Sequence, residues 1–285
     1  MTEYRIEPQF ENFAVKLYCE DLGLLLADSD HRQTLVDLLD QYMVLHIRPQ
    51  RALTKPVIGE LGFIFGYPQD RRNPRNIPLE RSDAVGYEFI GDFSAKARPN
   101  LPGPRIPTYI GSLHYDGISR CSIYTGISAP KTTPNLWADM RAAYANLSLD
   151  MRKIIDQRFA LHAVIPPPNT PLADFPDFDA TTAERRPLVI KHPRTEEPLL
   201  YLPKNPASKI EGLNDDEGRD VLHELWAHVN TLPTRYASTV AHNEVVVWDG
   251  LGTTHTNPAY PRDQDRTSWF FIVPAPSERL DHFYA

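Results

Sequence analysis

The stretch EVVVWDGLGTTHTNPAYPRDQDRTSWFFIV, residues 244–273, contains two apolar runs joined by a polar connection. Both runs are rich in Val, Trp, Phe and Ile, which favour β-strands, and the polar residues between them indicate a turn and a loop. His255 follows the turn, and Arg266 opens the second run. The stretch therefore predicts two strands that present a histidine and an arginine near their ends.

The rest of the chain contains more short β-rich runs than helical segments. Apolar residues recur at helical spacing within residues 30–46, a second helix is expected from Ser148, and Asn214 with Glu217 forms the capping signature of a third. The further β-rich runs are PTYIGSLHY (107–115), CSIYTGI (121–127), PLVIKH (187–192) and PLLYL (198–202). Because strands and helices do not alternate, we expect a mainly β, double-sheet fold with peripheral helices.

The composition bounds the class of protein. With 41% hydrophobic and 24% charged residues, the chain can bury one large core, and we expect a single domain over residues 1–285. The net charge is −7 and no Lys/Arg-rich run or membrane-length apolar run occurs, so we expect neither nucleic-acid nor membrane partners. The absence of a signal-peptide pattern and the presence of only two cysteines favour a reduced, cytoplasmic protein. A homo-oligomer stays open.

Residues 165–187, IPPPNTPLADFPDFDATTAERRP, are rich in Pro, Asp and Thr and predict a long loop. Loops of this length are usually functional lids or disordered segments. We therefore treat residues 165–187 as a candidate active-site lid, with a plain surface excursion as the alternative.

The segment LHYDGISR, residues 113–120, contains a His-x-Asp pair. On a strand, His114 and Asp116 would point to the same face, which suits two ligands of one metal. Roughly one such match is expected by chance in a chain with 10 His and 37 acidic residues, so the pair needs a third ligand. His255 could supply it, because two histidines and one carboxylate form the ligand set of non-haem Fe(II) oxygenases. Arg266 would offer a two-pronged donor to a carboxylate.

Several other histidines and charged residues are interpreted as structural. In HELWAH, residues 223–228, the two histidines are five positions apart and diverge by about 140° around a helix, so no zinc-protease site is expected. His242 is expected in a solvated turn, and Arg120 and Lys131 are expected as solvated surface charges. Trp248 is expected in the core.

Together these segments resemble the TauD/TfdA family of Fe(II)- and 2-oxoglutarate-dependent dioxygenases. HRQTLVDLLDQYMVLHIRPQ followed by ELGFIFGYPQ is similar to that family's helix, strand and Phe-Gly turn, and LHYDGISR stands at its His-x-Asp pair. ADMRAAYANLS and HPRTEEPLLYLP are similar to two middle segments, and VVVWDGLGTTH with the later arginine is similar to the C-terminal pattern. Several ordered matches over most of the chain are far more specific than one His-x-Asp pair.

The resemblance implies residue roles and a fold. His114, Asp116 and His255 correspond to the iron ligands, and Arg266 corresponds to the arginine that pairs with the distal carboxylate of 2-oxoglutarate. The implied core is a double-stranded β-helix, a relative of the jelly roll, with the metal inside one open end.

The sequence departs from the family pattern at two places near this site. The family's G-G-D-T, whose threonine assists the co-substrate, here reads TTPN, residues 132–135, so Asn135 takes that role in an ungapped alignment and Thr133 is its rival. Phe270 stands four residues after Arg266, where sulfonate-using members carry a second arginine. This departure disfavours a small sulfonate such as taurine as the substrate.

The function that the resemblance implies is oxidation of an unactivated C–H bond in a small organic molecule. Such an enzyme would use Fe(II), 2-oxoglutarate and O2 and release succinate and CO2; hydroxylation leads, and desaturation, epoxidation or cyclisation stays open. A role in secondary metabolism fits. Two alternatives compete: a cupin-like metalloenzyme that needs no keto acid, which gives Arg266 no role, and a non-catalytic relative, which leaves the joint presence of the ligands and Arg266 unexplained.

Overall fold

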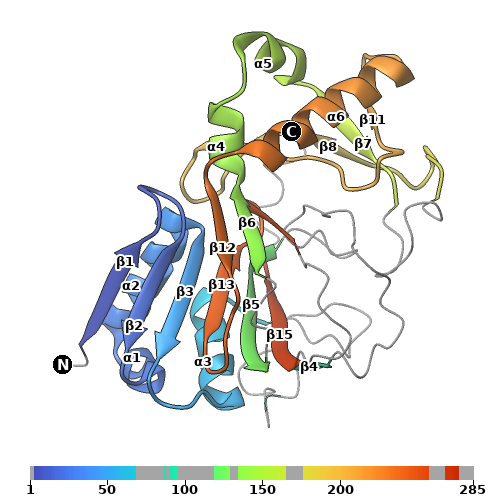
Figure 1. Ribbon diagram of the computed structural model, residues 1–285. Coiled ribbons are helices and arrows are strands. Elements are labelled where there is room, and N and C mark those ends of the chain that lie inside the picture. The colour runs from blue at the N-terminus through green and yellow to red at the C-terminus, as the bar shows by residue number, and fades with distance from the viewer. Residues whose placement is uncertain are drawn as a thin grey trace.

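The computed structural model describes residues 3–68, 87, 90–94, 119–128, 134–164, 176–256 and 267–275. Figure 1 shows a large sheet in one half of the molecule and a group of helices with short strands in the other. The large sheet has seven strands, in the order β1 (Tyr4–Pro8), β2 (Val15–Cys19), β3 (Val44–Pro49), β13 (Val245–Asp249), β5 (Ser119–Ser128), β15 (Thr267–Pro274) and β4 (Gly91–Ser94). β2 and β3 run parallel, and the other neighbours run antiparallel.

One face of this sheet is covered by three helices, α1 (Leu22–Ala27), α2 (Ser29–Tyr42) and α3 (Lys55–Phe65). Alternate residues of the central strands point to these helices, because side-chain direction alternates along a strand. The fully buried ones are Leu45, Ile47, Ile123, Val245, Val247, Phe271 and Val273. Each such side chain contributes about 1.5–3 kcal/mol when it leaves water, so this first core anchors the large sheet.

The opposite face of the large sheet meets a three-stranded sheet made of β12 (Arg235–Ser238), β6 (Asn135–Asp139) and β14 (Thr253–Thr256). Trp248 of β13 and Trp137 of β6 lie between the two sheets, with ring centroids 5.8 Å apart. Val44, Val246 and Tyr236 pack with them in a second core. The residues that carry the candidate site lie in this inner layer.

A third core lies on the far side of the three-stranded sheet. It is formed by α4 (Met140–Ala145), α5 (Leu149–Ile155) and α6 (Asp215–Thr231) together with five short strands. The strands are β7 (Phe159–His162), β8 (Glu184–Pro187), β9 (Val189–Lys191), β10 (Pro198–Leu200) and β11 (Lys209–Ile210). In Figure 1 these elements form the half of the molecule that holds α6.

Asn205 joins two segments at the edge of this third layer. Its side chain is 1% exposed, and its Nδ2 donates to the carbonyl oxygens of Val164 at 2.8 Å and Pro176 at 3.4 Å. Residues 165–175, the first part of the candidate lid, lie outside the described residues. The remainder of that candidate, residues 176–187, contains a turn and all of β8. Asn205 therefore holds together the two described residues that flank 165–175.

The three predicted helices are confirmed. α2 occupies most of the predicted segment, and Ser148 caps α5 by accepting the Met151 N–H at 3.1 Å. Asn214 and Glu217 form a reciprocal capping box at the start of α6. Local capping chemistry was sufficient to place these helix ends.

The predicted mainly β class requires a correction, because the described residues form a mixed α/β structure. α1 and α3 were not predicted; α1 has only six residues, which is too short to display a helical period. The facing sheets agree with the predicted double-sheet arrangement, but the part of the chain that the structure describes does not display a complete double-stranded β-helix. The predicted run at 107–115 lies outside that part. Among the described helices, none is both long and apolar enough to cross a membrane.

Candidate active site

His255 lies on the inner face of the three-stranded sheet. In the strand register it is opposite Trp137 of β6, which in turn is opposite Tyr236 of β12, so the three side chains form one row on one face. The imidazole is half-buried, and its centroid lies 5.0 Å from the ring of Trp248 on the large sheet. The sequence-predicted third ligand therefore sits between the two sheets, where a metal would be shielded from bulk water.

Asn135 lies on the same face as His255, one row away. It is two residues before Trp137 on β6, so the two side chains point the same way, and it is opposite Ser238 of β12. Asn135 is 6% exposed. The role of Asn135 beside a bound co-substrate stays a prediction, and its rival Thr133 lies outside the described residues.

The other predicted site residues, His114, Asp116 and Arg266, lie outside the described residues. In sequence, Asp116 is three residues before β5 and Arg266 directly precedes β15, and these two strands are neighbours in the large sheet. Within the described ranges, no group of three or more His, Cys, Asp or Glu side chains could hold a metal. The described part thus supplies one proposed ligand, His255, and the donor chemistry of the proposed set suits iron.

The turn that delivers His255 is organised by Asp249, the last residue of β13. Its Oδ1 accepts the backbone N–H groups of Leu251 at 2.9 Å and Gly252 at 2.7 Å, and its carbonyl oxygen accepts the Thr253 hydroxyl at 2.7 Å. These bonds close the connection between β13 and β14. Because β14 starts at Thr253, the carboxylate of Asp249 fixes the start of the strand that carries His255.

The second oxygen of Asp249 lies in a buried cluster of charges. Its Oδ2 accepts hydrogen bonds from Arg120 at 2.9 Å and from Arg194, and both guanidinium groups also contact Asp40 of α2. His192 completes the cluster, with Nε2 3.2 Å from the same oxygen. The interpretation of Arg120 as a solvated surface charge was wrong: its side chain is 5% exposed and ion-paired. Lys131 lies outside the described residues.

Burial alone would raise the pKa of the Asp249 carboxyl, but the positive field and hydrogen bonding of its partners lower it. The partners, in order of effect, are His192, Arg194 and Arg120. Asp249 is therefore ionised at neutral pH, and two arginines balance it and Asp40 in charge. The W-D and H-P-x-T segments resemble a family pattern in the sequence, but the contact among His192, Arg194 and Asp249 was not predicted.

A second buried polar network lies at the other end of β13. Glu244 Oε2 is 3.0 Å from His46 Nε2, and His46 Nδ1 is 2.6 Å from the hydroxyl of Tyr236. Arg48 and the backbone N–H of Ala241 also donate to the Glu244 carboxylate. His242 lies in an exposed turn, as predicted, whereas the burial of Glu244 two residues later was not predicted.

The charge states in this second network follow from its partners. Burial would raise the pKa of Glu244, but hydrogen bonds from His46 and Ala241, and the charge of Arg48, outweigh it and lower that pKa to about 2. Burial lowers the pKa of His46, and burial raises the pKa of Tyr236 to about 12. At neutral pH the network therefore contains an ionised Glu244, a neutral His46 and a neutral Tyr236.

Aromatic side chains line the inner layer beside His255. Trp248 stacks on Phe270 of β15 with centroids 6.1 Å apart, which confirms the prediction that Trp248 lies in the core. Phe270 is half-buried at the edge of the same core. An apolar ring thus lies at the edge of the inner layer beside Trp248.

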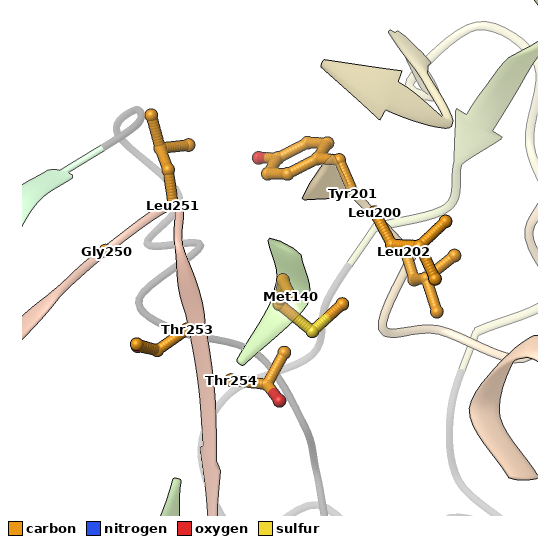
Figure 2. Close-up of a pocket in the computed structure, with 8 residues that line it drawn as sticks. All are labelled: Met140, Leu200, Tyr201, Leu202, Gly250, Leu251, Thr253 and Thr254. Carbon is orange, nitrogen blue, oxygen red and sulfur yellow. The ribbon is translucent and has the colours of Figure 1, made fainter. Parts of the chain in front are cut away.

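Figure 2 shows the residues that line a small, separate hollow at the β13–β14 turn. It is lined by Met140, Leu200, Tyr201, Leu202, Gly250, Leu251, Thr253 and Thr254. In Figure 2, Thr253 and Thr254 lie on opposite sides of their strand, and Thr254 faces Met140. His255 is not among the lining residues, so the hollow does not include the predicted metal ligand.

The chain matches the family described as taurine catabolism dioxygenase TauD, TfdA family over residues 17–271. It belongs to this family of 2-oxoglutarate-dependent non-haem iron dioxygenases. The family resemblance seen in the sequence is therefore confirmed.

Two curated relatives differ in what their names describe. The chain is 28% identical over 138 residues to pentalenolactone F synthase of Streptomyces arenae, which is 44% of this chain and 46% of that protein. It is 30% identical over 142 residues to (S)-phenoxypropionate/alpha-ketoglutarate-dioxygenase of Delftia acidovorans, which is 47% of this chain and 48% of that protein. The chain spans about half the length of the curated relatives it matches.

Solved structures agree on the fold. AAD-2, in complex with Mn(II) and N-oxalylglycine, matches with a TM-score of 0.74 and 20% identity, covering 96% of this chain and 98% of that one. A taurine dioxygenase from Burkholderia xenovorans matches with a TM-score of 0.73 and 20% identity, covering 96% and 91%. Structures of this type have a jelly-roll core, with which the two facing sheets agree.

Proposed function

We propose that the protein is an Fe(II)- and 2-oxoglutarate-dependent oxygenase that oxidises an unactivated C–H bond of a small organic substrate. The observation that carries the proposal is the position of His255, which faces the inner layer one row from Asn135 in a chain of this family. Hydroxylation is the leading outcome, and desaturation or cyclisation are the further outcomes that the same chemistry permits. Succinate and CO2 would be the co-products.

Each site residue has a proposed part in binding. His114, Asp116 and His255 would hold Fe(II), Arg266 would pair with the distal carboxylate of 2-oxoglutarate, and Asn135 would donate a hydrogen bond to that co-substrate. When bound, the iron and the keto acid activate dioxygen and supply the oxidising power. The contribution of the chain is to orient the substrate and to keep water out, for which the buried aromatic layer beside His255 is suited.

The substrate we propose has an apolar part near Phe270 and is not a small sulfonate. Phe270, which is half-buried and stacked on the buried Trp248, offers an aromatic surface on which an alkyl or aryl group would pack. The names of the two relatives support this choice, since one describes a phenoxypropionate dioxygenase and the other a pentalenolactone synthase. The chain would act as a cytoplasmic enzyme on a small molecule.

The test is an anaerobic titration of the metal-free protein with Fe(II) and 2-oxoglutarate, followed by visible absorption. A chelated keto acid gives a metal-to-ligand charge-transfer band, which we expect in the wild type and in His223→Ala, a control histidine exposed on α6. We expect His255→Ala and Arg266→Ala to lose or weaken the band. An iron-binding wild type without a band would contradict the proposal and favour the cupin-like alternative.

A further inference from the structure

A continuous line of aromatic rings leads from His255 to the buried network at the far end of β13. The ring centroids of His255 and Trp248 are 5.0 Å apart, those of Trp248 and Trp137 are 5.8 Å apart, and those of Trp137 and Tyr236 are 5.8 Å apart. The line ends at the hydroxyl of Tyr236, 2.6 Å from His46 Nδ1. Among protein side chains, indole and phenol rings are readily oxidised by one electron. Electron transfer between rings in contact is fast.

The line is insulated from water along its length. Trp137 is 1% exposed, Trp248 3%, Tyr236 4% and His46 1%. An oxidised ring in this line is therefore in contact with another ring of the line and is shielded from solvent. Only His255, at the site end, is half-buried.

At the Tyr236 end, only one assignment of hydrogen-bond donors and acceptors fits the contacts of Tyr236, His46 and Glu244. Glu244 is ionised and can only accept, so Nε2 of His46 must carry the proton that it donates to Glu244. Nδ1 of His46 is then the bare nitrogen, and the Tyr236 hydroxyl donates to it. Tyr236 thus has a base in place to receive its proton when it is oxidised.

The two tryptophans lack such a base. Nε1 of Trp137 and Nε1 of Trp248 are buried without a hydrogen-bond partner in the described part of the structure. An oxidised indole that keeps its proton remains a strong oxidant, whereas a phenol that passes its proton to a neighbouring imidazole becomes a stable neutral radical. Electron transfer from Tyr236 to an oxidised tryptophan is therefore favourable, and the radical ends on Tyr236.

We propose that Trp248, Trp137 and Tyr236 form a one-electron relay to the iron site. When no substrate is bound, the relay supplies an electron from Tyr236 to the oxidant formed at that site. The relay rests on the proposed function, because its oxidant is the high-valent iron oxidant that O2 and 2-oxoglutarate generate. That oxidant gains one electron, passed along Trp248 and Trp137 from Tyr236. Tyr236 loses one electron, and its hydroxyl proton moves to Nδ1 of His46, next to the Glu244 carboxylate.

The experiment is electron paramagnetic resonance of the protein loaded with Fe(II) and 2-oxoglutarate, mixed with O2 without substrate and frozen at successive times. We expect a tyrosyl radical, identified by the narrowing of its signal in protein grown with ring-deuterated tyrosine. Tyr236→Phe should lose the tyrosyl signal, and Trp137→Phe should lose it while leaving a tryptophan-type radical. Tyr42→Phe, which removes another buried tyrosine hydroxyl in the first core, should keep the wild-type signal.

The anaerobic charge-transfer band of each sample separates failure of the relay from failure of the proposed function. A wild-type protein that shows the band but forms no protein radical overturns the relay alone. A tyrosyl signal that persists in Tyr236→Phe or is unchanged in Trp137→Phe also overturns the relay. A wild-type protein without the band overturns the proposed function and, with it, the oxidant on which the relay depends.

Discussion

The two ends of strand β13 carry two buried carboxylates with different sets of partners. Asp249, at the end of the strand, is held by the guanidinium groups of Arg120 and Arg194, by His192 and by two turn amides. Glu244, immediately before the strand, is held by His46 and Arg48. The pKa of both carboxyls is lowered, yet the surroundings of the two differ.

The difference lies in what surrounds the imidazole at each end. At the Asp249 end, His192 lies beside a carboxylate that Arg120 and Arg194 also hold, and a guanidinium keeps its protons under all ordinary conditions, so these fixed positive charges hold the backbone in place. An imidazole can gain or lose a proton near neutral pH, and His46 connects Glu244 to a phenol. One end of β13 is therefore suited to positioning His255, and the other is suited to receiving a proton.

The largest effect on stability is expected from removing the Asp249 carboxylate. Asp249→Ala would remove one of the two carboxylates that hold the buried Arg120, leaving it only Asp40, and would free the amides of the β13–β14 turn. We expect a loss of about 3–5 kcal/mol in the free energy of unfolding, the usual cost of removing one partner of a buried ion pair. Urea denaturation measures this loss, and a value below about 1 kcal/mol would contradict the role given to the cluster.

The second effect concerns pH at the Glu244 end. The pKa of Glu244 falls from 4.5 to about 2 on folding, so its contribution is complete above pH 4.5 and is lost as the pH falls towards about 2. The shift corresponds to about 3 kcal/mol, of which about 2 kcal/mol is expected to disappear between pH 6 and pH 3. Glu244→Gln lacks this dependence, so the stability difference between it and the wild type should narrow by that amount. The free energy of unfolding of both proteins is measured by urea denaturation from pH 6 to pH 3. A difference between the two proteins that does not change with pH would contradict the lowered pKa of Glu244.

A matched pair of glycines can sharpen the comparison. A Cβ on Gly250 would lie 2.5 Å from the carbonyl oxygen of Ser119 at the Asp249 end, and a Cβ on Gly126 would lie 2.2 Å from the carbonyl oxygen of Ala241 at the Glu244 end. Backbone must shift in both cases, so each Gly→Ala change should cost about 1–3 kcal/mol.

The two glycine variants should differ in function. Gly250→Ala displaces the turn that leads to His255, and we expect weaker Fe(II) binding from it, measured by titration. Gly126→Ala should leave Fe(II) binding close to that of the wild type. Equal effects of both changes on Fe(II) affinity would show that the two ends of β13 are not separate in role.

The smallest effect on stability is expected from Tyr236→Phe. The change removes one buried hydrogen bond, and Ser238 Oγ, 3.4 Å from His46 Nδ1, can take over part of it. We expect a loss of about 1 kcal/mol in thermal or urea unfolding. A loss as large as that of Asp249→Ala would mean that the network at this end is also mainly structural.

Local sequence patterns predicted the features that depend on neighbours in the chain. The caps at Ser148 and Asn214 follow from residues three positions apart, and the strand that contains Trp248 follows from its β-branched run. His255 was identified because its place relative to Arg266 matched a family pattern, and the register places it on the inner face. The roles of His114 and Asp116 stay predictions.

The buried networks could not be predicted in the same way. Arg120 and Asp249 are 129 positions apart, and His46 and Glu244 are 198 positions apart, so no local spacing relates them. A charged residue at a strand end has the same local pattern whether it faces water or a partner from another strand. Only the fold brings such pairs together, which is why Arg120 was misread as a surface charge.

Asn205 has a consequence for the engineering of this protein. Its amide ties Val164 to Pro176, so the chain enters and leaves the intervening eleven positions, 165–175, from anchored points. Replacing those positions with segments of other lengths and compositions should therefore leave β7 and β8 paired, because Asn205 holds the two residues that flank them. The segment can then be exchanged as a cassette without rebuilding the scaffold.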